Sequence, residues 1–435
     1  MRLKSLFSKL LGNRVAKNAG WIIGGKVIHM VLALFVSLLT ARYLGPGNYG
    51  LINYAGAYTT FFFSLCTLGI NSILVKAFVD EPDQCGTILG TALLLRFLSS
   101  TFSVLTIIGI SLIADRGEPT TIWVVALCSL GLVFQIFDTF NYWFQYRLQS
   151  KFCALATTIG YVIVSAYKLL MLALDMSVEW FAVSSSVDYV IVAICLGIAY
   201  KKNGGGKLGF SWKKAKELLG SGYHFILSGL MVAVYGATDR LMLKHVLGET
   251  EVGYYSTALA VCNLWVFLLS AIIDSMKPVI LQKHKTDRKN YLRLNKQLYA
   301  IIFYVSVAVS LCFIVLGKFV IKLLYGEAYL PAVGPLKVIT WYTAFSYLGV
   351  AREAWVVSEH KQKYLKFLYA GAAVSNVILN AFLIPVWGAS GAAVASLITQ
   401  ISTIFVFPIM IKDLRPNAKL MIEAILLRGV KDKQE

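Results

Sequence analysis

The stretch "ARYLGPGNYG" at residues 41–50 separates two apolar segments of more than twenty residues each. Its glycines and its arginine leave three interpretations open: a phosphate-binding loop, a tight turn, or one copy of a larger repeated pattern. Gly45 and Gly47 permit unusual backbone angles, and Pro46 stiffens the first turn position, which favours a tight turn. The apolar segments on both sides then decide where this turn lies.

The whole chain is rich in such apolar segments. Hydrophobic residues make up 58% of the 435 residues and charged residues 14%, and the mean hydropathy is +0.69. A helix needs about 20 apolar residues to cross a bilayer. Twelve segments are long enough: 20–43, 51–75, 87–113, 120–144, 152–174, 178–200, 220–243, 254–276, 298–324, 333–357, 365–387 and 388–411. The composition therefore predicts an all-α polytopic membrane protein with about 12 transmembrane helices.

The positive charges of the chain lie almost entirely on one side of these spans. The connections from odd to even spans hold only Arg42, Arg116 and Lys244, whereas the opposite side holds thirty lysines and arginines. By the positive-inside rule, both termini and the long basic loops are cytoplasmic. A patch that binds nucleic acid would not follow membrane sidedness, so the net charge of +19 indicates orientation rather than nucleic-acid binding.

The opening stretch also has an echo in the second half of the chain. "RYLGPGNYGLINYAGA" at 42–57 aligns with "HVLGETEVGYYSTALA" at 245–260 at a constant offset, which pairs Gly45 with Gly248 and Gly50 with Gly253. Six spans separate the two copies, and because six is even, both halves point the same way through the bilayer. This is a parallel repeat of two six-helix lobes, as in transporters that rock two bundles about a central site.

The repeat and the charge pattern together divide the chain. Residues 1–18 alternate leucines with cations in the manner of an interfacial amphipathic helix rather than a cleaved signal. A Gly-rich stretch, "KKNGGGKLGFSWKKAKE", has the composition of a flexible linker. The predicted parts are a cytoplasmic interfacial helix at 1–18, an N-terminal lobe at 19–200, a cytoplasmic linker at 201–217, a C-terminal lobe at 218–411 and a cytoplasmic tail at 412–435.

Polar residues recur at helical spacing in about half of the spans, and Asn53 belongs to the stripe of the second span. A single serine or threonine on such a stripe is explained by hydrogen bonds between helices. Stripes in many helices together indicate a hydrated central cavity. Tyr142 lies on the stripe of the fourth span and can offer a ring face and a hydroxyl to a sugar. An interfacial aromatic belt is the alternative for the neighbouring Trp143.

Charged residues within spans are more informative, because they must pair or meet water. Arg96 and Asp188 fall nearest the bilayer midplane, Lys26 and Asp138 toward the cytoplasmic third, and Lys168 toward the outer third. The three cations are candidate contacts for an anionic cargo such as a phosphate or pyrophosphate. Ion pairs with the two acids are the structural alternative.

Two further charges near span ends have simpler explanations. Arg352 is expected to extend toward the interface, as long cationic side chains do at helix ends. Asp239 has a neighbouring cation, Arg240, as a local partner. The seven cysteines are scattered without CxxC or Cys/His spacing, which predicts small buried residues rather than a metal site or a disulfide framework.

Four motifs, in order, resemble the polysaccharide flippases of the MOP exporter superfamily, specifically O-antigen or capsule repeat-unit flippases. They are "ARYLGPGNYG" at 41–50, "TDRLMLKHVLGETEVGYYSTALAV" at 238–261, "LLYGEAYLPAVGPLKVI" at 323–339 and "NVILNAFLIPVWGASGAAVASLIT" at 376–399. Each motif is loose alone, and the resemblance covers about residues 14 to 412.

The resemblance implies a MATE-like fold, with two six-helix lobes around a cationic central cavity. It also implies that the protein moves an undecaprenyl-pyrophosphate-linked oligosaccharide to the outer leaflet of the bacterial inner membrane by alternating access. Coupling to a proton or sodium gradient is expected, with no other cofactor, and a polysaccharide polymerase is a possible partner. Lys26, Arg96, Lys168, Tyr142 and Asn53 are then candidates for cargo contact. For the coupling ion the candidates are Asp188, Asp138 and Asp239.

Three alternatives remain beside this hypothesis. A multidrug cation exporter of the same superfamily would need unpaired carboxylates in its cavity to bind a cationic drug. The N-terminal half of this chain carries more intramembrane cations than such a drug site would need. A lipid II flippase usually has fourteen spans rather than twelve. Membrane glycosyltransferases and polymerases that act on lipid-linked sugars resemble one another in carrying a large outer loop for catalysis. The outer connections of this chain are short. The chain also lacks an Asp-x-Asp pair, a nucleophile elbow, HExxH and GxxxxGK[ST], which argues against an enzyme or a nucleotide-driven pump.

Overall fold

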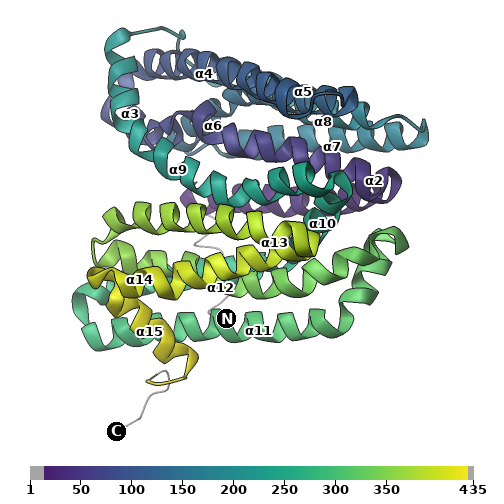
Figure 1. Cartoon of the computed structure of the whole chain (residues 1–435). Coiled ribbons are helices and arrows are strands. Elements are labelled where there is room, and N and C mark those ends of the chain that lie inside the picture. The colour runs from purple at the N-terminus through teal and green to yellow at the C-terminus, as the bar shows by residue number, and fades with distance from the viewer. Residues whose placement is uncertain (1–13, 430–435) are drawn as a thin grey trace, which may run out of the picture. The chain divides into compact units, whose positions relative to one another are not determined.

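The fold of the chain is seen in a computed structural model that describes residues 14–429, apart from the side chains of residues 14–32, 72, 224, 227, 228 and 285. Within that range the chain is helical throughout and contains no strand (Figure 1). Its α-helices are α2 Arg14–Thr67, α3 Leu74–Asp80, α4 Cys85–Ala114, α5 Pro119–Phe134, α6 Thr139–Tyr146, α7 Lys151–Ala173, α8 Val178–Lys202, α9 Trp212–Leu247, α10 Glu249–Thr286, α11 Arg288–Tyr325, α12 Val333–Ser358, α13 Leu365–Ile401, α14 Phe407–Met410 and α15 Arg415–Ile425.

Short helical turns connect several of these helices. Most are 3-10 turns, and one is a π-helix that joins α13 to α14. They are η1 Ile70–Ser72, η2 Pro82–Gln84, η3 Gln135–Asp138, η4 Glu327–Ala332, η5 Gln362–Tyr364, the π-helix η6 Ser402–Val406 and η7 Lys412–Leu414.

The predicted membrane-spanning architecture is confirmed. Seven helical stretches in the described part of the chain are long and apolar enough to cross a bilayer, and one of them, Gln362–Met410, contains two predicted spans. The remaining four predicted spans lie in α2, α9 and α12. Two long helices bend where one span gives way to the next: α2 at Gly45 (φ 68°, ψ 172°) and α13 at Gly388 (φ 56°, ψ −136°). Both bends use backbone angles that only glycine adopts readily.

The helices form two compact units. Within the described residues, unit 1 comprises 14–44 and 54–233, and unit 2 comprises 45–53 and 234–429. In unit 1, α5 packs against α4 and α8, and α8 also packs against α7. In unit 2, α12 packs against α10, α11 and α13, and α15 covers part of α11 (Figure 1). Each unit has its own apolar core, around Phe78 and Phe144 in unit 1 and around Tyr299 and Trp355 in unit 2.

These units do not end where the predicted lobes end, and α9 gives the reason. This helix continues without a break from Trp212 to Leu247, and its first part packs within unit 1. There the Lys214 ammonium contacts the Glu81 carboxylate, and Leu218 is buried in the apolar core. Helix packing therefore divides the chain inside α9 rather than in the linker. The lobe boundaries at residues 200 and 218 stay a prediction about moving parts.

The Gly-rich linker is docked rather than flexible, which corrects the interpretation of its composition. Its backbone lies directly against α4: a Cβ added at Gly86 would be 2.3 Å from the Lys207 carbonyl oxygen, and one added at Gly90 would be 2.3 Å from that of Gly209. The Tyr200 hydroxyl also donates to the Gly206 carbonyl at 2.9 Å. The glycines therefore serve close backbone packing.

The repeated motif at Gly45 and Gly248 has the same local structure in both copies. Gly248 has φ 94° and ψ 176°, close to the angles of Gly45, and each glycine directly precedes a helical segment. Gly50 and Gly253, the second aligned pair, contact each other within unit 2: a Cβ on Gly50 would be 2.7 Å from the Gly253 nitrogen. The prediction for Gly47 was wrong, because this residue is helical; Gly45 alone makes the turn.

Candidate functional site

A buried carboxylate is the most distinctive polar feature of unit 2. Asp239 lies on α9, is 3% exposed, and accepts hydrogen bonds from four neutral side chains. Asn376 and Asn380 of α13 donate their amide hydrogens to Oδ1 at 3.1 and 2.6 Å. Ser396 of α13 donates to Oδ2 at 2.7 Å, and the Tyr255 hydroxyl of α10 also donates to Oδ2. The expected local ion pair with Arg240 is therefore not what satisfies this carboxylate.

The Asp239 cluster, defined as Asp239, Tyr255, Asn376, Asn380 and Ser396, gathers oxygen atoms in a small volume. The Oδ1 atom of Asn380 is buried and has no hydrogen-bond partner among the described residues. Carboxylate, amide and hydroxyl oxygens are the ligands that hard cations prefer. Arg240, the next residue on α9, lies within electrostatic range of Asp239. The oxygen atoms around this buried carboxylate make the cluster suited to take up a proton or a small cation.

The sequence pointed to Asp239 but not to its partners. Asn376 and Asn380 are four residues apart and thus lie on one face of α13, so a search for polar residues at helical spacing in the eleventh span would have found them. Ser396 and Tyr255 gave no such signal. Ser396 is 157 residues from Asp239 along the chain, and only the packing of α13 against α10 brings the set together.

The charged candidates of the first half gather in unit 1. Arg96 of α4 is 1% exposed and donates from Nη1 to the Thr139 hydroxyl at 2.6 Å and from Nη2 to the Gln135 carbonyl at 3.4 Å. Asp138 lies within electrostatic range of Arg96 and of Asp188.

The same group continues to Lys168 of α7, which lies within electrostatic range of Asp188 of α8. Asp188 is half-buried, and its Oδ1 would be 3.0 Å from a Cβ placed on Gly160. Arg96, Asp138, Asp188 and Lys168 thus form one charged group in which two carboxylates lie between two cations. Each carboxylate lies within electrostatic range of one cation and of the other carboxylate, and the four formal charges sum to zero.

The remaining sequence candidates are dispersed. Asn53 belongs to unit 2 and donates to the Tyr49 carbonyl of its own helix at 2.8 Å. Tyr142 lies in unit 1, half-buried and within electrostatic range of Arg96 and Asp138. The side chain of Lys26 lies outside the described residues. The five candidate cargo contacts are therefore not gathered within either unit.

Arg352 differs from its expected position at an interface. It is 2% exposed and donates from Nη1 to the Thr403 carbonyl at 3.0 Å. Thr403 belongs to the π-helix η6, and a π-helical turn displaces carbonyls from the regular α-helical hydrogen-bond pattern. The guanidinium uses one of these carbonyls, so Arg352 ties α12 to the irregular segment between α13 and α14.

No metal-binding group of three or more His, Cys, Asp or Glu side chains occurs in the described part of the chain. All seven cysteines are free.

Long apolar helices in two units, each with buried polar side chains, define a polytopic membrane protein. The structure is similar to that of lipid II flippase MurJ in an inward closed conformation, with a TM-score of 0.71 and 16% identity over 94% of this chain and 91% of that one. It is also similar to an inward-facing multidrug resistance MATE transporter, with a TM-score of 0.65 and 13% identity over 92% of this chain and 99% of that one.

A MOP superfamily transporter from Pyrococcus furiosus is a third similar structure, with a TM-score of 0.60 and 14% identity over 95% of this chain and 98% of that one. The sequence identifies a narrower family than the similarity of fold does. The chain belongs to the family described as polysaccharide biosynthesis proteins, whose sequence profile matches residues 39–334. A comparison with curated proteins gives no sequence match.

Proposed function

We propose that this protein is a flippase that moves an undecaprenyl-pyrophosphate-linked oligosaccharide repeat unit from the cytoplasmic to the outer leaflet, for O-antigen, capsule or exopolysaccharide synthesis. The observation that carries the proposal is the family match over residues 39–334 in a chain with the MOP superfamily fold. Transport between leaflets fits a polysaccharide pathway because the repeat unit is too polar to cross a bilayer unaided. A catalytic role is not part of the proposal.

We propose that the protein lies in the bacterial inner membrane with both termini in the cytoplasm. The thirty basic residues on one side of the spans support this orientation. A polysaccharide polymerase would receive the flipped repeat unit and is the proposed partner on the outer side.

For the cargo, the proposed contacts remain Lys26, Arg96, Lys168, Tyr142 and Asn53. The side chains of two of these cations, Arg96 and Lys168, are described, and their surroundings indicate which of them is more accessible to an anionic head group. Lys168 is half-buried and lies within electrostatic range of one carboxylate, that of Asp188. Arg96 is fully buried and already donates to two oxygens of unit 1. An anionic head group would therefore meet Lys168 more readily, and contact with Arg96 would require its present hydrogen bonds to break.

For the coupling ion, the Asp239 cluster is better suited than Asp138 or Asp188. Asp239 accepts its hydrogen bonds from neutral amides and hydroxyls, so the oxygen atoms that could hold a proton or Na⁺ are already gathered around it. Arg240 lies within electrostatic range of Asp239, just as Arg96 and Lys168 lie within range of Asp138 and Asp188, so the gathered oxygen atoms are what distinguishes the cluster. We propose that the gradient acts through Asp239 and its oxygen neighbours.

Purified full-length protein in liposomes tests the proposal directly. Fluorescent undecaprenyl-pyrophosphate oligosaccharide is placed in the membrane, and a membrane-impermeant glycosidase added outside reports how fast the sugar appears there. We expect transfer that requires the protein and is accelerated by a proton or sodium gradient. Protein-dependent efflux of a cationic dye without sugar transfer would instead identify a multidrug exporter, and transfer restricted to lipid II would identify a lipid II flippase.

Two variants separate the proposed roles in the same assay. Asp239→Asn preserves size but removes the charge and replaces one acceptor oxygen with a donor NH2 group, so transfer should lose its acceleration by the gradient and keep the slow basal rate. Lys168→Gln should lower transfer at limiting cargo in both conditions by at least tenfold, which corresponds to about 1.4 kcal/mol of lost interaction. Gradient dependence that survives in Asp239→Asn would contradict its coupling role.

A further inference from the structure

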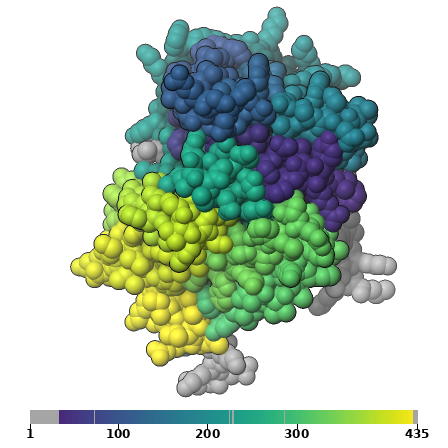
Figure 2. All heavy atoms as spheres, turned by 45° about the vertical axis from the view of Figure 1, so that its right-hand side comes forward, coloured from purple at the N-terminus to yellow at the C-terminus, as the bar shows by residue number. Residues whose placement is uncertain are grey.

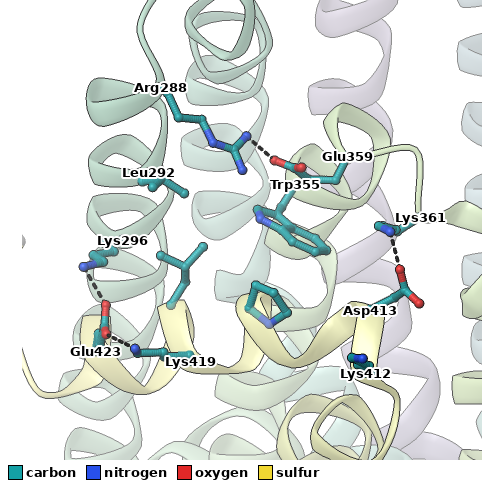
Figure 3. A pocket seen from close by; sticks show the side chains of 12 residues that line it. Arg288, Leu292, Lys296, Trp355, Glu359, Lys361, Lys412, Asp413, Lys419 and Glu423 are labelled. Carbon is teal, nitrogen blue, oxygen red and sulfur yellow. Dashed lines mark hydrogen bonds and ion pairs between the residues drawn. The ribbon is translucent and has the colours of Figure 1, made fainter.

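Unit 2 contains a pocket that the proposed function does not use. It has a volume of about 770 Å³ and lies among the first turns of α11, the end of α12 and the helix α15 (Figure 3). Its centre is apolar, with the Trp355 ring, Leu292 and Leu420 among its lining. Charged side chains of both signs surround this centre. The pocket therefore combines an apolar floor with a charged rim.

Ion pairs engage every carboxylate of this rim. The three pairs join helices that are distant in sequence and stand around the Trp355 ring in Figure 3. They are Arg288 with Glu359, Lys296 with Glu423 at 2.6 Å, and Lys361 with Asp413. The Lys361 ammonium, helped by the Tyr364 hydroxyl, lowers the pKa of Asp413 below its ordinary value. Each of the three carboxylates thus has a basic partner within ion-pair distance.

Two lysines of the rim are not needed to neutralise these three carboxylates. Lys412 pairs with no carboxylate among the described residues. Lys419 approaches the Glu423 carboxylate only to 3.9 Å, while Lys296 is already 2.6 Å from that carboxylate, and the Lys419 side chain is 79% exposed. Five cations and three carboxylates line the pocket, so it carries a surplus of two positive charges. This surplus favours an anionic ligand.

Exposed apolar side chains next to the pocket indicate where that anion comes from. Met410, at the end of α14, is 72% exposed, and Leu426 and Leu427, directly after α15, are 55% and 53% exposed. The C-terminal segment, drawn in yellow, lies at the surface in this view (Figure 2). Basic and apolar side chains exposed together at the end of the last span and directly after it are typical of a segment at the lipid interface. A soluble anion would need the lysines but not the apolar neighbours.

We infer that this pocket binds the phosphate head group of an anionic membrane phospholipid, with Lys412 and Lys419 as the phosphate contacts and the apolar centre around Trp355 accepting the glycerol and upper acyl chain. Basic pockets between helices on the cytoplasmic side of a membrane are suited to such head groups. The inference does not rest on the proposed transport of cargo, because it concerns a resident lipid, but it does rest on the proposed orientation, which puts the pocket on the cytoplasmic side.

Native mass spectrometry of the purified full-length protein in detergent tests the inference. Dioleoyl phosphatidylglycerol, which is anionic, and dioleoyl phosphatidylcholine, which is zwitterionic, are titrated separately. We expect the wild-type protein to bind the anionic lipid at least tenfold more tightly. The double variant Lys412→Ala/Lys419→Ala should weaken that binding by roughly thirtyfold, since each lysine near a membrane surface contributes several-fold to the attraction.

Two control variants make the result specific to the pocket. Lys318→Ala/Lys322→Ala removes two exposed lysines at the other end of α11 and should leave binding unchanged. Lys412→Arg/Lys419→Arg keeps the charge and should retain binding. Equal affinity of the wild-type protein for the two lipids, or an equal loss in the Lys318/Lys322 variant, would overturn the inference. Displacement of the lipid by millimolar glycerol phosphate would also overturn it, by assigning the site to a soluble phosphate.

Discussion

Asp239 shows how much one residue can demand of its surroundings. A carboxylate that is 3% exposed must recover its lost hydration, and it does so from two amides and two hydroxyls rather than from a cation. Neutral donors stabilise the charge but leave the cluster net negative. The oxygen atoms gathered around Asp239 are the physical basis for the proposal that it takes up the coupling ion. A nearby cation does not distinguish it, since Arg240 lies within electrostatic range of Asp239 as Arg96 and Lys168 do of Asp138 and Asp188.

Gly50 is the residue at which close packing leaves the least room. An added Cβ would lie 1.8 Å from the Glu249 carbonyl oxygen, which belongs to backbone and cannot swing aside. We expect Gly50→Ala to destabilise the protein by about 1 to 3 kcal/mol, as overpacking does, and to lower the melting temperature in detergent. Gly56→Ala on the same helix is the matched control, because nothing lies within 4 Å of its Cβ position.

The Gly56→Ala variant should melt at or slightly above the wild-type temperature, because alanine favours a helix over glycine. Equal melting temperatures for Gly50→Ala and the wild-type protein would show that the contact between the segments at Gly50 and Gly253 is looser than the structure describes.

At the scale of elements, residues 203–211 of the Gly-rich linker, here called the strap, show why composition alone gave the wrong interpretation of a flexible segment. Glycine-rich sequence is common in flexible linkers, and the same glycines also allow two backbones to touch. Here the second property decides: the Gly209 amide donates to the Gly86 carbonyl at 3.3 Å, and the Ser211 amide donates to the Thr91 hydroxyl at 3.1 Å. The strap is an ordered part of unit 1.

Substitution of Gly86 tests whether the strap is docked. In Gly86→Ala the new Cβ would collide with the Lys207 carbonyl oxygen at 2.3 Å, so the strap should lift from α4. We expect trypsin to cleave after Lys207 several times faster than in the wild-type protein, measured by mass spectrometry of the fragments. Gly109→Ala, also on α4 but with open space at its Cβ position, should be cleaved at the wild-type rate. Equal rates in all three proteins would argue against docking.

The break in α13 is a second element whose cause lies elsewhere in the chain. After Gly388 the helix restarts, and the Ala389 amide donates to the Glu251 carboxylate at 2.7 Å. An anionic group at the first turn of a helix satisfies free amides and complements the helix dipole. Glu251, at the start of α10, thus stabilises the bend at Gly388. The parts of α13 before and after this bend contain two successive predicted spans.

At the scale of the whole molecule, the predicted orientation in the membrane rests on charge rather than on any contact. Arg116 lies on the side with three basic residues, and Lys207 lies on the side with thirty. Both side chains are exposed. In a background with the seven cysteines replaced, a membrane-impermeant maleimide applied to intact cells should label the Arg116→Cys variant and not the Lys207→Cys variant.

Disruption of the cells should make both variants reactive, which controls for access to the reagent. Labelling of Lys207→Cys in intact cells, with Arg116→Cys protected, would reverse the orientation and place the basic loops outside. That outcome would also remove the support for a cytoplasmic lipid site beside α15, since the pocket lies on the same side as the basic loops.

The sequence by itself determined the spans, their number, the parallel repeat and the family. These are local properties: hydropathy over about 20 residues decides whether a helix can cross a bilayer, and a short motif shows the repeat at Gly45 and Gly248. The candidate charges could also be found, because a charged residue inside an apolar span is conspicuous wherever its partner lies. It could not be told from the sequence that Arg352 is buried against η6 or that α15 forms a helix on α11.

Only the tertiary structure decided which polar residues meet. Asp239 receives its hydrogen bonds from residues up to 157 positions away, and the packing of α9, α10 and α13 sets which of many polar side chains are within reach. The same is true of the pocket around Trp355, whose surplus of positive charge appears only after the ion pairs between α11, α12 and α15 are known. Hydropathy acts along the chain, whereas hydrogen bonds and ion pairs depend on distances that folding creates.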